Sequence, residues 1–334
     1  MSDASAAPAA SGDFDFDSLL SPSASTPPGP APAAAPNPAA TAAQPPPLTR
    51  VAHEEQPTWR DFADNWALYR DPVLCGVTAG AVLGVLGVFV VLRRAVFVTA
   101  AVSQSAALGV ALAFLLGIYL GVTPPPVLCA FILALAATGV LAWRSPSTRL
   151  PREAIVGLLY VAASALAVLV GDRIAQEAED ITAILFGSAV LVRPQDFVAV
   201  LGVSGLVVVA IGFLYRGLVF AGFDPEGARV QALPTARIEL ALWTLVALEV
   251  SVTTRAIGAL PVFAFSVLPA MAALRASSRL SHAVLLAGLA GALSGGVGYI
   301  SAFLLRFPVG AAEACIAAVL FSIAVLVARL RRTT

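Results

Sequence analysis

The sequence predicts an all-α, polytopic membrane helical bundle of about nine transmembrane helices, within a range of eight to ten. The chain is 59% hydrophobic and only 12% charged. Between Pro72 and Arg332 it consists of successive apolar segments of about 20 residues, the length that crosses a hydrocarbon core of about 30 Å. Most segments are apolar on every side, which indicates that their solvent is lipid.

Composition excludes some functions. The net charge is zero, which argues against nucleic acid as a partner. All 20 basic residues are arginine, whereas a nucleotide-binding P-loop needs a lysine at the phosphates. The chain therefore cannot hydrolyse ATP through a P-loop. Cys75, Cys129 and Cys315 all fall in apolar segments, where we expect small buried side chains and not a disulfide or a metal site. No cofactor is predicted.

Three regions follow one another along the chain. Residues 1–56 are rich in Ala, Pro and Ser and are expected to form a disordered tail without the pattern of a signal peptide. Residues 57–71 predict an amphipathic helix at the membrane surface. Residues 72–332 form the transmembrane domain. Aromatic side chains recur at helical spacing in the second region, namely Trp59, Phe62, Trp66 and Tyr69.

The transmembrane domain divides into apolar segments with ends uncertain by several residues. The nine predicted spans are 73–92, 95–121, 126–143, 154–171, 197–215, 238–254, 257–274, 282–305 and 310–328. Pro261 and Pro269 lie inside the seventh segment and predict a kinked or broken helix. Glycines repeat every three or four residues in the first and eighth segments, which predicts close helix packing.

Arginines predict the orientation, because connections rich in arginine stay in the cytoplasm. Along the chain, connections that carry arginine alternate with connections that do not. The C-terminal tail also carries arginines and belongs with the first group. These cytoplasmic arginines are Arg93, Arg94, Arg144, Arg149, Arg152, Arg216, Arg229, Arg237, Arg275, Arg279, Arg329, Arg331 and Arg332. The acidic connection 172–196 falls on the outer side. Nine spans place the N-terminal tail outside, whereas eight or ten place it in the cytoplasm.

Four stretches resemble the membrane permease of zinc/manganese/iron-type ABC importers, in order and over about residues 70–330. They are Val91–Leu112, Asp180–Gly187, Gly222–Pro234, and the set of Ile257–Pro261, Val267–Ala270 and Phe307–Gly310. The resemblance implies a type II-like ABC importer permease in the bacterial inner (plasma) membrane. It implies a homodimer in the lipid bilayer, a separate ABC ATPase subunit and a periplasmic solute-binding protein. The chain itself is then no enzyme.

The third stretch is similar to the family's loop that docks on the ATPase. Its residues Phe223, Asp224, Pro225, Glu226 and Ala228 carry the resemblance. The residue types fit an ordered turn outside the lipid, because Asp caps a helix and Pro is tolerated at its first position. An ordinary solvated loop with a helix cap is the alternative.

The family usually carries Asp-x-x-x-His in the second span. Such an i, i+4 pair puts a carboxylate and an imidazole on one helical face, which suits a divalent first-row metal. Here the matching positions are Ala100 and Gln104, and neither His53 nor His282 is an obvious substitute. The expected function is import of a divalent metal, zinc or manganese, with fewer protein ligands than usual. The alternatives are a degenerate paralogue, another solute, or a non-transporting scaffold or sensor.

Polar residues inside spans are the candidate translocation path. Ser103 and Gln104 either line a polar path or hydrogen-bond between helices. Glu249 lies near the middle of the sixth segment, where a carboxylate costs roughly 2.5–3.5 kcal/mol, so it is expected to face a cavity or a partner. We hypothesise that it replaces the lost carboxylate; a structural residue, protonated or paired with Arg255, is the alternative. Glu313 is expected near the outer interface.

Two further classes fit the residues less well. An intramembrane enzyme needs clustered catalytic groups in the spans, and Glu249 stands alone there. A secondary transporter needs coupling-ion residues, which the sequence does not reveal.

Overall fold

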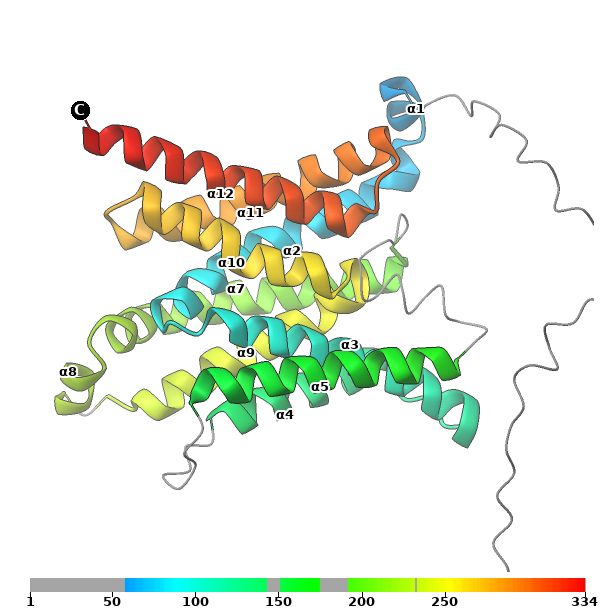
Figure 1. The fold of residues 1–334 in the computed structure, drawn as a ribbon, viewed down its shortest axis with the longest axis horizontal. Coiled ribbons are helices and arrows are strands. Elements are labelled where there is room, and N and C mark those ends of the chain that lie inside the picture. The colour runs from blue at the N-terminus through cyan, green and yellow to red at the C-terminus, as the bar shows by residue number, and fades with distance from the viewer. Residues whose placement is uncertain (1–57, 143–150, 175–191, 232, 334) are drawn as a thin grey trace, which may run out of the picture. The chain divides into compact units, whose positions relative to one another are not determined.

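The computed structural model describes residues 58–142, 151–174, 192–231 and 233–333, and every regular element in these ranges is an α-helix. The predicted tail 1–56 and the family-like stretch Asp180–Gly187 lie outside the described residues. The helices are α1 (Trp59–Asp64), α2 (Trp66–Leu92), α3 (Val96–Leu120), α4 (Pro126–Ala142), α5 (Arg152–Arg173), α7 (Pro194–Phe223), α8 (Pro225–Val230), α9 (Thr235–Ile257), α10 (Ala259–Ala276), α11 (Leu280–Leu305) and α12 (Val309–Thr333) (Figure 1).

Each of the nine predicted apolar segments coincides with one helix. Eight helices of the described ranges are long and apolar enough to cross a membrane, and α4, with 17 residues, is shorter. At 1.5 Å per residue α4 spans only about 25 Å. The prediction of a polytopic all-α membrane bundle is confirmed.

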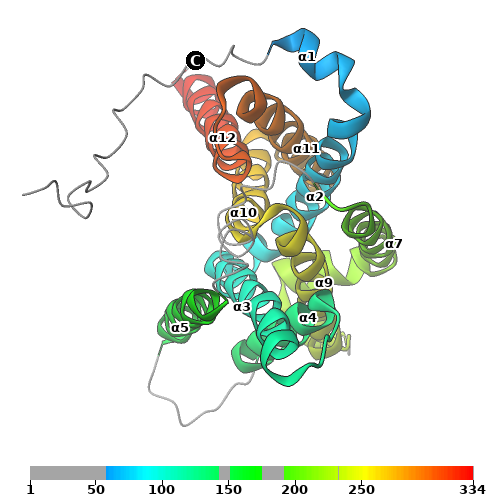
Figure 2. The ribbon, with the colours of Figure 1, turned by 90° about the vertical axis from the view of Figure 1, so that its right-hand side faces the viewer.

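Glycines bring α2 against α11, as their spacing predicts. A Cβ on Gly80 would overlap the carbonyl oxygen of Gly291, and a Cβ on Gly84 would overlap that of Ala287. The two backbones therefore touch without intervening side chains, which is how small residues drive helix association in lipid. Helices α2, α3, α9 and α10 are the most buried spans, whereas α5, α7 and α12 lie at the periphery (Figure 2).

Helices α9 and α10 are joined by one residue, Gly258. Its φ is 96°, a conformation that glycine adopts at little cost. Pro261 lies in the first turn of α10, where no backbone donor is needed, and Pro269 lies inside the helix. The seventh segment was expected to be kinked or broken; α10 continues through Pro269 without a break.

The aromatic stretch before the first span is divided between two helices. Trp59 and Phe62 are on α1, whereas Trp66 and Tyr69 begin α2. Phe62 is buried and its ring lies 5.3 Å from that of Phe303 on α11. Hydrogen bonds from the backbone and side chain of Thr58 complete a capping box and lower the pKa of Asp61. The position of this stretch at the membrane surface stays a prediction.

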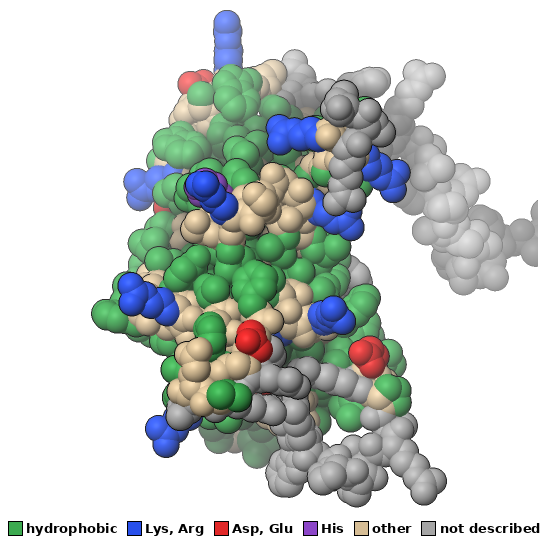
Figure 3. Space-filling model, turned by 90° about the vertical axis from the view of Figure 1, so that its left-hand side faces the viewer, with side chains coloured by type: hydrophobic (Ala, Val, Ile, Leu, Met, Phe, Trp, Pro, Cys, Tyr) green, Lys and Arg blue, Asp and Glu red, His purple; other side chains and the backbone are tan. Residues whose placement is uncertain are grey.

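The helix ends next to the arginine-bearing connections all lie at one end of the bundle, together with α8 and the C-terminus (Figure 1). Arginine side chains are spread over this end, and few acidic ones are visible there (Figure 3). Because arginine-rich connections remain cytoplasmic, we assign this end to the cytoplasm.

Glu313 is only 1% exposed, because Gly76 and Gly298 leave room for it between α2, α11 and α12. Its expected depth near the outer interface stays a prediction, whereas the expectation that all three cysteines are buried was wrong. Of the three cysteines only Cys75 is buried, and Cys315 is exposed on the outer face of α12.

Candidate translocation site

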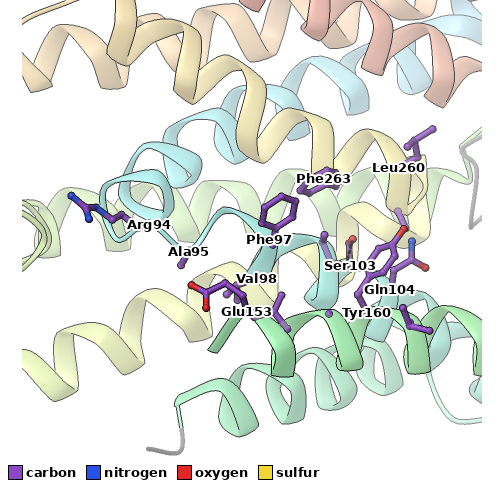
Figure 4. Close-up of a pocket in the computed structure, with 15 residues that line it drawn as sticks. Arg94, Ala95, Phe97, Val98, Ser103, Gln104, Glu153, Tyr160, Leu260 and Phe263 are labelled. Atoms are coloured by element: carbon purple, nitrogen blue, oxygen red, sulfur yellow. Dashed lines mark hydrogen bonds between the residues drawn. The ribbon is translucent and has the colours of Figure 1, made fainter. Parts of the chain in front are cut away.

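A cavity of about 410 Å³ lies between α3, α5 and α10. Apolar and aromatic side chains form most of its wall, including Phe97 of α3, Val156 of α5 and Phe263 of α10 (Figure 4). Its size and its largely apolar wall with a few polar groups are typical of small-molecule sites in proteins.

The polar and charged groups of the cavity come from α3, from α5 and from the α2–α3 turn. Ser103 and Gln104 both line the cavity, as does Tyr160 of α5. The hydroxyl of Ser103 donates to the carbonyl oxygen of Ala100 at 3.0 Å, so its hydrogen is already used. The Oε1 atom of Gln104 is buried and has no hydrogen-bond partner among the described residues.

The charged groups are at one end of the cavity. Arg94 and Glu153 line the cavity near the α2–α3 turn, whereas Gln104 and Tyr160 lie about two helical turns away, at the other end (Figure 4). Arg94 holds this turn in a left-handed conformation, with φ of 53°. The neighbouring Arg93 is partly buried, which lowers its pKa, while Glu239 opposes the shift. The cavity is thus charged at the end near the α2–α3 turn and neutral at the other end.

The positions that match the family's metal pair are both on the cavity wall. Ala100 and Gln104 lie one turn apart on α3 and line the same space. Ala100 offers no ligand and Gln104 only an amide. No cluster of three or more His, Cys, Asp or Glu suited to a metal occurs in the part of the chain that the structure describes. These residues do not fit a tightly coordinated divalent ion.

Glu249 lies elsewhere. Its side chain is fully buried on α9 and accepts a hydrogen bond from the Ser204 hydroxyl of α7 at 2.7 Å, and it is not among the residues that line the cavity. Arg255, considered as its partner, instead pairs with Asp196 at 2.7 Å. The structure therefore brings Ser103 and Gln104 together and leaves Glu249 apart. A role of Glu249 in the path stays a prediction.

Sequence reasoning missed the contribution of α5 to this site. Glu153, Gly157 and Tyr160 lie at helical spacing on its cavity face. A glutamate and a tyrosine seven residues apart in an apolar segment were the available signal. Leu260 and Phe263 of α10 had no such signal, because they resemble any other apolar residues of a span.

The segment that resembles an ATPase-docking loop forms an ordered turn. The Asp224 Oδ1 atom accepts a hydrogen bond from the Gly227 backbone at 2.8 Å, as the predicted cap requires. Phe223 at the end of α7 and Val230 at the end of α8 are strongly exposed, and Ala228 is fully buried. The side chains of Pro225 and Glu226 lie outside the described part.

A polytopic helical bundle with a cavity between its spans and an ordered turn at its cytoplasmic end is the architecture of a transport permease. The chain belongs to the ABC 3 transport family, which matches residues 66–328. This confirms the resemblance seen in the sequence. The protein is a permease subunit of an ABC transporter and not an enzyme, and it is a multi-pass protein of the bacterial plasma membrane.

Individual relatives agree with the family. The chain is 26% identical to the manganese transport system membrane protein MntC of Listeria innocua over 266 residues, covering 79% of this chain and 92% of that protein. It is 28% identical to the manganese import system permease protein ScaB of Streptococcus parasanguinis, covering 81% and 95%. The solved structure of PsaBC from Streptococcus pneumoniae superposes with a TM-score of 0.72 at 21% identity, covering 80% and 95%, and shares the fold.

Proposed function

We propose that this chain is the permease of an ABC importer for a divalent metal, with manganese favoured and zinc as the alternative. The observation that carries the proposal is the location of Ala100 and Gln104. Both family metal positions face one cavity, in a chain that matches the family over most of its length. The relatives MntC and ScaB are named for manganese transport, which supports manganese as the cargo.

A separate ATPase binds the cytoplasmic end in this proposal. The turn at α8 presents Phe223 and Val230, which are 63% and 87% exposed, beside the arginine-rich surface. Exposed apolar anchors with charges around them are typical of a protein interface. A solute-binding protein delivers the cargo at the opposite end, and the ATPases drive the alternation between inward-open and outward-open states.

The working unit is a homodimer with the path along its two-fold axis. Phe97 and Tyr160 line the cavity and are also exposed at the surface of the protomer. The amide of Gln104 beside them would be unsatisfied if the cavity opened to lipid, where polar groups are costly. A second copy against α3 and α5 would close the cavity, which supports this arrangement.

Docking can be tested with Phe223→Asp. This change puts a charge on the exposed anchor beside α8, and we expect the ATPase to be lost from the purified complex and manganese accumulation to fall to the level of the gene deletion. Phe307→Asp is the matched control, because Phe307 is also exposed but lies between α11 and α12 at the other end. It should retain the ATPase.

Manganese and zinc are separated by uptake of each radioactive ion in cells with and without the gene. Chain-dependent accumulation of manganese supports the favoured cargo. Accumulation of zinc alone would replace it. A deletion that changes neither, in cells where the complex is intact, would contradict metal import and favour the scaffold.

A further inference from the structure

We infer that the cavity between α3, α5 and α10 carries its metal inside an organic chelate, so that the chelating molecule and not the protein supplies the ligands. This inference rests on the proposed function and names the chemical form of its cargo. It follows from the ligand set, the size and the charge distribution of the cavity.

The cavity wall offers too few metal-binding side chains to hold a bare divalent ion. Divalent first-row metals are held by carboxylate, imidazole or thiolate groups. Away from the α2–α3 turn, the described lining offers the Gln104 amide and the hydroxyls of Ser103 and Tyr160. Glu153 is the single carboxylate of the lining, and it lies near that turn. A metal that arrives already coordinated needs no ligands from this wall.

The size of the cavity also suits a ligand larger than a metal ion. A volume of about 410 Å³ falls in the range of sites for small organic molecules, roughly 300–1,000 Å³. Phe97 and Phe263 offer aromatic surface, which stabilises an apolar or planar ligand face.

The charge of the cargo also favours a chelate over a bare ion. A hydrated divalent ion would bring two uncompensated charges into an apolar chamber, which is strongly unfavourable. A chelator with anionic oxygens cancels that charge before entry. The cargo class is therefore a neutral or weakly charged complex of a divalent metal with a small carboxylate, phenolate or hydroxamate ligand.

The test is double-label uptake in the gene deletion strain that carries the full-length chain and its natural partners. Radioactive manganese(II) is offered alone and with an excess of radiocarbon-labelled citrate, salicylate or acetohydroxamate. We expect metal and carbon labels to enter together with at least one chelator, and manganese alone to enter far more slowly.

Gly157→Trp tests the size of the cargo. Gly157 lines the cavity and an added side chain there meets open space, so the variant should fold. We expect co-uptake to fall about tenfold or more, because the indole fills the chamber. Gly202→Trp on α7 is the control, since it also meets open space and lies outside the lining. If Gly157→Trp fails to fold, the smaller change Gly157→Leu replaces it in the same assay. An immunoblot measures the protein level of both variants.

The outcomes separate this inference from the proposed function. Chain-dependent entry of manganese without the carbon label, or entry of the bare ion unaffected by Gly157→Trp, overturns the chelate and leaves metal import standing. Entry of the carbon label without metal, or no chain-dependent entry of either label, overturns both.

Discussion

The hydroxyl of Ser204 on α7 donates to the Glu249 carboxyl on α9 at 2.7 Å, and both side chains are shielded from solvent. The second carboxyl oxygen, Oε2, has no partner among the described residues. This bond joins a peripheral helix to one of the most buried spans. It gives Glu249 a packing role that needs no contact with the cavity.

Glu249→Gln distinguishes a packing role from a role in the path. The amide oxygen still accepts from Ser204, so we expect the stability of the purified permease to be retained, and unchanged substrate uptake would confine Glu249 to packing. Ser204→Ala removes the donor and should lower the free energy of unfolding by about 1–2 kcal/mol. Thermal denaturation in detergent and cellular uptake are the measurements. Loss of uptake by a stable Glu249→Gln protein would assign Glu249 to the path.

The contact of α2 with α11 should not tolerate a methyl group. In Gly291→Ala the new Cβ would overlap the carbonyl oxygen of Gly80, and we expect a loss of about 1–3 kcal/mol in stability. Gly202→Ala is the control, because its methyl group meets open space and favours the helix. Equal thermal stability of the two variants would show that the helices separate at small cost.

Restoring the family's ligand pair should restore coordination of the bare ion. We expect the combined change Ala100→Asp and Gln104→His to bind manganese or zinc in equilibrium dialysis of the purified chain in lipid nanodiscs, where the wild type does not. Binding should strengthen as the pH rises, because an imidazole ligand must lose its proton first. The control is Gln104→His alone. Equally tight binding by the wild type would contradict the poor ligand set found in the cavity.

Arg255 and Asp196 form the partly buried ion pair at the outer end of α9, 2.7 Å apart. Arg255→Gln leaves the Asp196 carboxylate without its charged partner and should lower stability by about 1–3 kcal/mol. Exchanging the two residues, Asp196→Arg with Arg255→Asp, should recover part of that loss. The same denaturation assay measures all variants. If the single variants are as stable as the wild type, the ion pair does not contribute to stability.

The sequence located the site only in part, and particular residues show why. The positions Ala100 and Gln104 were found because the second span resembles the family's stretch that carries Asp-x-x-x-His, and such an i, i+4 pair lies within one helix. Glu249 was grouped with them because a buried carboxylate is costly, yet that cost does not say which neighbour meets it. Its neighbour Ser204 is 45 residues away in the chain.

The sequence by itself determined the apolar helices of the described ranges and their order, because hydropathy acts through the solvent on each segment separately. The cytoplasmic end stays a prediction from the placement of the arginines. The tertiary structure determined which helices and which side chains contact one another. Only the close approach of α3, α5 and α10 creates a cavity, only the glycine contact seats α2 on α11, and only the room beside Gly76 and Gly298 buries Glu313. These are contacts between segments distant in the chain, and in lipid they depend on shape and hydrogen bonding, which hydropathy does not record.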